Sequence, residues 1–226
     1  MTTNARAGDV ATLDILGFSQ DGGIFAFEEY GVQDGSGFPY ANRYYIDTAS
    51  DSYVKGTPIR VRLDDESASL QAARDKAREQ GEAIVSQAEL TENRGFTAGS
   101  NPVTELSADP SRMVVNPRPV IPPIDTPLEF RLETIPFGEL EQCHGMGEAV
   151  GFRLLRIDAA DGGKTQLVHE DTSIPKSRNC PTGYFIGAIQ TFSSGLDLSR
   201  YAVLIGVQQI GFEGPNYRWM AVTGVY

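Results

Sequence analysis

The sequence predicts a mainly β protein made of antiparallel sheets, as a sandwich or as blade-like meanders, with one long helix inserted around residues 66–90. Three observations support this fold class. Most segments alternate apolar and polar residues, as half-buried strands do. Asp-Gly-Gly sequences separate pairs of such segments, and this chemistry favours tight hairpin turns. In a single stretch the apolar residues recur every three or four positions, which is typical of an amphipathic helix.

The first part of the chain predicts a β-meander. Residues 10–18 and 24–27 read as two strands joined at Asp21-Gly22-Gly23. Residues 28–40 are expected to form a loop, because several glycines and a proline interrupt any regular pattern. Further strands are expected at residues 42–47, 53–54 and 59–63. The last of these has charged alternate residues, Arg60 and Arg62, which indicate a solvated face.

The helix is expected to begin after Asp64 or Asp65, either of which can cap its first turn. Its apolar stripe is mostly alanine and glycine and runs through Leu70, Ala73, Ala77, Gly81, Ile84 and Ala88. Such a stripe buries little area but lets a second backbone approach closely. Gly81 in mid-helix costs about 1 kcal/mol relative to alanine, so a break or a close contact is expected there. A helix lying partly solvated on a sheet is favoured over a partner-binding helix.

Prolines divide the chain into two halves. Residues 117–127 predict a stiff extended linker between an N-terminal half at 1–116 and a C-terminal half at 128–226, although the two could form one compact domain. A short edge strand is expected just before the linker, at 113–115. The second half predicts a hairpin turn at Asp161-Gly162-Gly163 and strands at 128–135, 150–158, 165–169, 184–192, 201–207 and 217–226.

The chain is acidic, with a net charge of −11 over 226 residues. This charge disfavours nucleic acid and anionic membranes as partners, because both attract basic surfaces. It permits a divalent cation or a basic protein, although solubility alone accounts for it. No apolar run is long enough to span a bilayer. The N-terminus as given lacks the apolar core of a signal peptide, but residues 5–9 look like the flank left after signal cleavage.

Four stretches of the chain are distinctive: GFSQDGGIFAFEEYGVQDGSGFPY (17–40), NPVTELSADP (101–110), IPKSRNCPTGY (174–184) and GFEGPNYRWMAVTG (211–224). Together they resemble an uncharacterised family of predicted secreted bacterial proteins. The first is also similar to a blade of the TolB-type propeller repeat. Too few such units fit for a closed propeller, which needs about four or more blades. The family resemblance implies a periplasmic or secreted location and assigns no activity.

Export bears on the state of Cys143 and Cys180. By themselves, two cysteines can be free buried thiols or one disulfide. In the oxidising compartment that the resemblance implies, a disulfide becomes the favoured state. It would tie the segment before the 150–158 strand to the segment before the 184–192 strand.

No catalytic motif stands out. The sequence lacks a G-x-S-x-G elbow, an S-x-x-K and an H-E-x-x-H. Ser36 lies between two glycines, but as a nucleophile it would need His144 or His169 to reach it across the domain. The two histidines are also too few and poorly spaced for zinc, so no metal and no cofactor are expected.

A competing hypothesis is that the protein is an enzyme. Paired carboxylates can hydrolyse glycosides, and loop acids could supply such a pair. A hydrolase acting on carbohydrate or peptide would use two of Glu28, Glu29, Asp34 and Glu213. Acids are plentiful in this chain, however, and nothing in their spacing singles out a pair.

The favoured hypothesis is a non-enzymatic exported binding or structural module. Two glycine-rich loops, at 31–40 and 211–216, would present a surface to an unidentified protein or envelope component. The candidate surface residues are Glu28, Glu29, Asp34, Ser36, Phe38, Tyr40, Glu213 and Arg218. A cation or small-ligand binder is a further alternative. Calcium at the Asp34 loop fits the composition, but turn geometry explains the same residues and is favoured.

Overall fold

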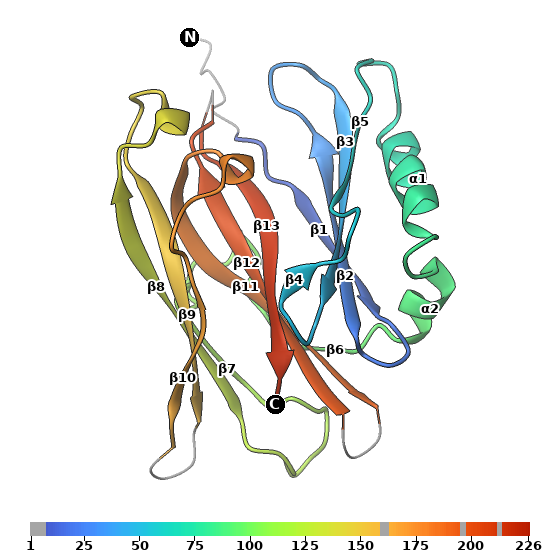
Figure 1. Ribbon diagram of the computed structural model, residues 1–226, viewed down its shortest axis with the longest axis vertical. Helices are drawn as coiled ribbons and strands as arrows, with labels where there is room; N and C mark the ends of the chain where they lie inside the picture. Colours follow the sequence, from blue (N-terminus) through green and yellow to red (C-terminus); the bar gives the residue numbers. More distant parts are fainter. Residues whose placement is uncertain (1–7, 159–162, 195–197, 212–213) are drawn as a thin grey trace.

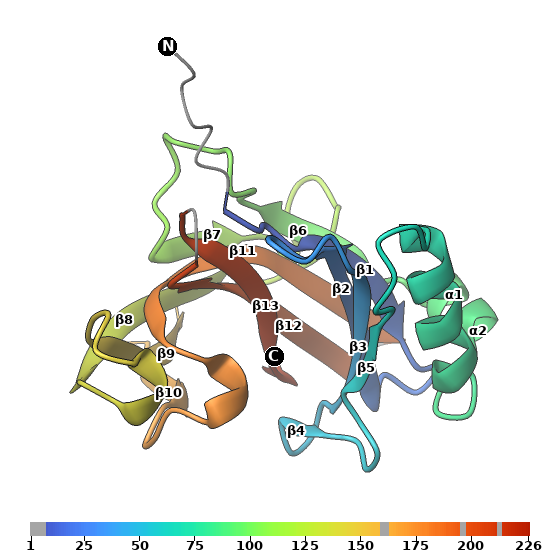
Figure 2. The ribbon, with the colours of Figure 1, turned by 90° about the horizontal axis from the view of Figure 1, so that it is seen from above.

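A computed structural model describes residues 8–158, 163–194, 198–211 and 214–226. Its three antiparallel sheets are stacked face to face, and two helices cover one outer face (Figures 1 and 2). We call them the far sheet, the central sheet and the helix-side sheet. The mainly β, antiparallel architecture expected from the sequence is thus confirmed. Within the described residues no helix is long and apolar enough to cross a membrane.

The helix-side sheet is a meander with the order β1-β2-β3-β4, and β5 pairs with β3. Its strands are β1 (Thr12–Phe18), β2 (Ile24–Val32), β3 (Pro39–Asp47), β4 (Ser52–Tyr53) and β5 (Ile59–Arg62). The predicted turn at Asp21 is present, where the Asp21 carboxylate accepts hydrogen bonds from the Ser19 hydroxyl and the Gly23 N–H. The prediction that a loop begins at residue 28 was wrong, because β2 continues to Val32. The phenol group of Tyr40 lies close over Gly31, where a Cβ would come within 3.0 Å of the Tyr40 hydroxyl oxygen, so glycine avoids a tight contact in this strand.

The far sheet has the order β10-β9-β8-β7, and the central sheet has the order β13-β12-β11-β6. The far sheet comprises β7 (Arg112–Val115), β8 (Leu128–Gly138), β9 (Ala149–Asp158) and β10 (Thr165–Glu170). The central sheet comprises β6 (Phe96–Ser100), β11 (Pro181–Ser194), β12 (Leu198–Gln209) and β13 (Asn216–Val225). β6 was missed in the sequence, and the predicted turn residues Asp161 and Gly162 lie outside the described residues. β6 and β7 precede the proline-rich segment, yet they complete sheets built otherwise from later strands.

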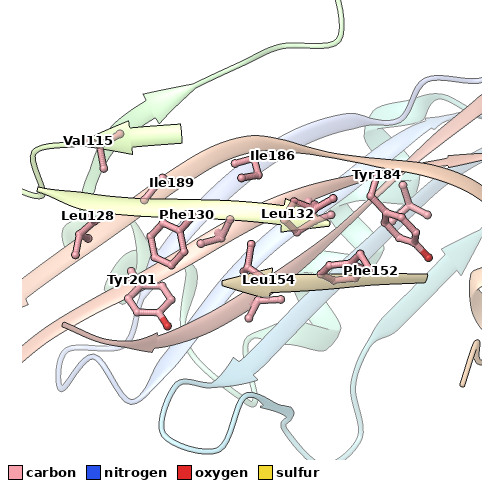
Figure 3. Close-up of a cluster of buried hydrophobic side chains, with 14 residues drawn as sticks. Val115, Leu128, Phe130, Leu132, Phe152, Leu154, Tyr184, Ile186, Ile189 and Tyr201 are labelled. Atoms are coloured by element: carbon pink, nitrogen blue, oxygen red, sulfur yellow. The ribbon is translucent and has the colours of Figure 1, made fainter. Parts of the chain in front are cut away.

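The central sheet is buried on both faces, which explains the continuous apolar run of β12. Tyr201, Val203 and Ile205 pack against Phe130 and Phe152 of the far sheet (Figure 3). The alternate residues of the same strand, including Leu204, pack against the phenylalanines of the helix-side sheet. Alternation along one strand therefore supplies two separate cores.

The stacked sheets do not support the comparison with a propeller blade. Blades of a propeller surround a channel, whereas these sheets lie face to face with side chains filling the space between them. Residues 12–47 do form an antiparallel meander, which is the pattern that produced the resemblance. A meander packs equally well in a flat stack, because its turns determine only the local order of strands.

The single helix expected at 66–90 is two short helices, α1 (Leu70–Gly81) and α2 (Gln87–Glu92). Neither Asp64 nor Asp65 caps α1. Asp65 instead accepts hydrogen bonds from Ser67, and the Ser69 side chain caps the helix. The alanine face of α1 lies on β3 and β5, and Gly81, its last residue, sits directly over the Tyr45 ring. The close approach expected from a small-residue stripe is therefore present, and the helix ends where it occurs.

We expect Gly81→Ala to destabilise the fold by about 1–3 kcal/mol, as overpacking does. The new Cβ would lie 2.0 Å from the Tyr45 hydroxyl oxygen, a contact that neither group can keep. In an open helix the same substitution would stabilise by about 1 kcal/mol. Urea denaturation measures the effect. The variant should lose less stability when combined with Tyr45→Phe, which removes the colliding atom, and an additive double variant would contradict the steric explanation.

Candidate binding site

A pocket of about 230 Å³ opens between the helix-side sheet, the central sheet and the loop that precedes β11. Its wall comes from β2, β3, β4 and β5 of the helix-side sheet, from β12 and β13 of the central sheet, and from residues 175–179, which precede β11. Figure 2 shows the segment of 175–179, in orange, and β4 on the two sides of β13. Three arginines line the pocket, Arg60, Arg178 and Arg218, together with the aromatic rings of Tyr44, Tyr53 and Trp219.

Arg218 is held in place by Asp9. It lies on β13, and its Nη1 and Nη2 groups donate to the backbone oxygen and the carboxylate of Asp9. Its guanidinium lies 5.1 Å from the centre of the Tyr40 ring, and the Tyr40 hydroxyl donates to the same Asp9 carboxylate. A buried aspartate therefore holds both Arg218 and Tyr40, two residues expected from the sequence to share a surface.

Arg178 belongs to a short 3₁₀ helix, η2 (Lys176–Arg178), in the loop before β11. Its Nη1 group donates to Asp171 at 2.7 Å and to the hydroxyl of Tyr184 at 3.2 Å. Burial by itself would raise the pKa of Asp171, but hydrogen bonds from His169 and Arg178 outweigh it and hold this pKa below its ordinary value. Asp171 therefore stays ionised and keeps Arg178 in position.

Arg60 is the least restrained of the three. Its neighbours on β5, Ile59 and Val61, are buried beneath α1, so Arg60 projects from the opposite face of the strand, toward the pocket. No hydrogen bond or ion pair joins its side chain to the described parts of the chain. The sequence predicted that this face of the strand is solvated, but it gave no sign that the face borders a pocket.

Glu29 lines the pocket and closes the edge of the central sheet. Its carboxylate accepts hydrogen bonds from the Asn42 amide, the Tyr44 hydroxyl and the backbone N–H of Trp219. Burial, followed by the charge of Glu29, raises the pKa of Tyr44 well above its ordinary value, so this hydroxyl remains a donor. β13 is an edge strand of the central sheet, and the backbone N–H of Trp219 points away from β12. Without Glu29 this buried N–H would have no hydrogen-bond acceptor.

Glu28 has a different role from Glu29, although the two are adjacent. It is fully buried on the opposite face of β2, where its carboxylate accepts from Arg43 of β3 and Arg74 of α1. Arg43 also donates to Gln87 of α2. Glu28 therefore fastens both helices to the sheet and does not face the pocket.

The other candidate residues lie in the loop between β2 and β3. Gly35 and Gly37 adopt positive φ, and the Ser36 hydroxyl bonds Gln33 and the Phe38 N–H, so hydrogen bonds shape the turn locally. Phe38 lies beneath the guanidinium of Arg62, and neither Asp34, Ser36 nor Phe38 lines the pocket. Glu213 lies outside the described residues. No group of three or more His, Cys, Asp or Glu side chains suited to a metal occurs in the described ranges.

A disulfide secures the wall that carries Arg178. Cys143, in the 3₁₀ helix η1 (Glu141–Cys143), forms a disulfide bond with Cys180. This is the disulfide that the resemblance to an exported family led us to expect. The bond is buried among Ala149, Phe137, Leu140 and Ile210. Beside it, the Gln142 amide donates to the backbone oxygens of Ile174 and Asn179. The loop at 174–180 is thereby tied down at both of its ends.

Comparison with known proteins agrees with this assignment to export. Residues 26–224 match the model of a family described as a predicted secreted protein (DUF2259). The chain belongs to this family. No curated protein matches it. No solved structure matches it either. In this predicted secreted protein, three of the four stretches that carried the resemblance, 17–40, 174–184 and 211–224, contribute residues to the pocket, whereas 101–110 does not.

Sequence reasoning missed Arg60 and Arg178 as members of one site. Arg178 lies inside the IPKSRNCPTGY stretch, so the motif pointed to its neighbourhood without giving it a role. For Arg60 the only signal was its place in an alternating strand, which indicated a solvated face but no pocket. The two residues are 118 positions apart in the chain, and no local pattern relates residues so distant.

Proposed function

We propose that this protein is a non-enzymatic binding module of the bacterial envelope, located in the periplasm or secreted, and that the pocket between the helix-side and central sheets is its binding site. One observation supports this proposal most. Three distant segments of the chain build a single pocket, and buried aspartates position two of its three arginines, Arg178 and Arg218. Pockets with a few convergent polar groups are the usual form of a ligand site.

The carboxylates offer less support for the hydrolase alternative. Of Glu28, Glu29 and Asp34, only Glu29 lines the pocket, and its two oxygens are taken by three donors. Glu28 and Glu29 point to opposite faces of β2, so they do not form a pair across a cleft. A second acid is what either form of glycoside hydrolysis requires.

Blocking the pocket tests the proposal. Ser177 is exposed at the pocket wall and Ser173 is exposed in the same loop away from it, so Ser177→Trp should obstruct the pocket and Ser173→Trp should not. The protein is dialysed to equilibrium against a small-molecule extract of periplasm, and retained compounds are identified by mass spectrometry. We expect at least one compound to be enriched by the native chain and by Ser173→Trp but not by Ser177→Trp. Equal retention by all three chains, or none by the native chain, would refute the assignment.

A further inference from the structure

We infer that the pocket binds a small anionic molecule through a phosphate or carboxylate group, which Arg60 and Arg178 contact directly. This inference rests on the proposed function, since it names the class of ligand for the same pocket.

Arg60 contributes an entire unused guanidinium. It lines the pocket from β5, and nothing in the described ranges accepts a hydrogen bond from its side chain. A guanidinium presents five N–H donors in a planar fork that matches the oxygens of a phosphate or carboxylate. An arginine at a pocket wall with no protein acceptor is therefore available to an anion from solution.

Arg178 contributes a guanidinium that is fixed but not saturated. Only its Nη1 group is engaged, with Asp171 and Tyr184, while its Nε and Nη2 groups have no partner in the described portion of the chain. Its side chain is 14% exposed, so it is already held in one place before a ligand arrives. Preorganisation of this kind lowers the entropy lost on binding.

The carboxylates nearby do not cancel these donors. Within the described residues, Glu29 is the only acid in the pocket wall, and it already accepts three hydrogen bonds. Asp9 and Asp171 lie behind the arginines that they hold, and each is buried. An entering anion meets open donors and no open acceptor of its own charge. In a chain with a net charge of −11, this is a local exception to the overall field.

The aromatic wall suggests the rest of the ligand. Tyr53 is 48% exposed beside the pocket and its ring packs against that of Tyr44. A ring or other flat apolar part of the ligand can lie against Tyr53 while the charged group reaches the arginines. Inorganic phosphate therefore probes the charge alone, and a sugar phosphate probes both features.

Isothermal titration calorimetry on the full chain at fixed ionic strength tests the inference. The probes are inorganic phosphate, glucose 6-phosphate and citrate, with glucose as the uncharged control. We expect saturable binding of at least one anion and none of glucose. Binding of the two phosphates without citrate assigns a phosphoryl group, and the reverse assigns a carboxylate. No saturable binding of any of the three anions would overturn the inference.

Variants locate the binding. Arg60→Gln should weaken it by about tenfold or more, as loss of a charged hydrogen bond does. Lys55→Gln removes the same charge near Tyr53 but outside the pocket wall, and should leave the affinity within about twofold. Arg178→Lys keeps a charge for Asp171 but loses the planar fork, so it should also weaken binding. Unchanged affinity in Arg60→Gln would refute the assignment.

The two proposals fail differently. If dialysis shows a compound retained by the native chain and lost in Ser177→Trp, while the three anions do not bind, the pocket is a binding site but not for an anion. If the anions bind and Ser177→Trp binds them equally well, the site lies elsewhere and both proposals are wrong.

Discussion

Replacing Glu28 with alanine is expected to lower the free energy of unfolding by about 3–5 kcal/mol, the range found when one partner of a buried ion pair is removed. Glu28 is fully buried, and its two oxygens accept from Arg43 at 2.8 Å and from Arg74 at 2.6 Å. The Arg43 side chain is only 5% exposed, so without Glu28 it would remain as an uncompensated charge inside the protein. A domain of this size typically has a total stability of about 5–15 kcal/mol, so the change would leave a marginal fold.

Urea denaturation measures this effect, and α1 offers a matched control. Asp75 also pairs with an arginine, Arg78, but both side chains are about half exposed. Asp75→Ala should therefore cost less than about 1 kcal/mol. A cost for Glu28→Ala as small as that for Asp75→Ala would contradict the importance of the buried pair.

A double variant separates the two contributions to this cost. If the penalty arises from the abandoned charge of Arg43, then Glu28→Leu combined with Arg43→Leu should be more stable than Glu28→Leu alone, because no buried charge remains. If the double variant loses as much stability as the two single variants together, Glu28 and Arg43 are not energetically coupled, and the abandoned charge is not the source of the penalty.

Loss of the disulfide is expected to destabilise the protein by about 4 kcal/mol in the chain-entropy model, since Cys143 and Cys180 are separated by 37 residues. Changing both cysteines to serine leaves no free thiol to form other bonds. Urea denaturation of this variant, with the oxidised native chain as reference, measures the cost. The native chain under reducing conditions should lose a similar amount.

The same variant should affect the pocket more than distant parts of the fold. The disulfide fastens the loop that carries Arg178, and without it only hydrogen bonds, such as those from Gln142 and Gln209, would hold that loop. Hydrogen exchange should rise in residues 174–180 before it rises in β2 and β3, which the bond does not touch. Uniform loosening across the chain, or no change in stability, would contradict this role.

Much of the secondary structure follows from local patterns in the sequence. Alternation predicted most of the strands, because residues two apart share a face and one face is buried. The Asp21 turn was equally predictable, since its hydrogen bonds join residues within five positions of one another. β6 was not predicted, because Phe96–Ser100 is a short strand composed mostly of small residues. It is recognised as a strand only by its pairing with β11. The helix break falls at Gly81, where the sequence led us to expect it, and only the structure shows that the Tyr45 hydroxyl lies against the helix there.

The candidate site was predictable in a more limited way. The stretches that carried the family resemblance led to Glu29 and Arg218, two of the residues that line the pocket. They did not distinguish Glu29 from Glu28, because two adjacent acids in a strand look alike until the partner on each face is known. Arg60 appeared only as part of a solvated face.

The sequence by itself determined the class of fold, most of the strands and, through the family resemblance, export and the disulfide. These depend on short-range periodicity and on the compartment, both of which can be read along the chain. Only the tertiary structure decided that three sheets stack, that Glu28 holds helices while Glu29 closes a sheet edge, and that Arg60, Arg178 and Arg218 share one pocket. The physical reason is that alternation shows which side of a strand is buried but not what buries it. That choice is made by packing between segments that are tens to more than a hundred residues apart.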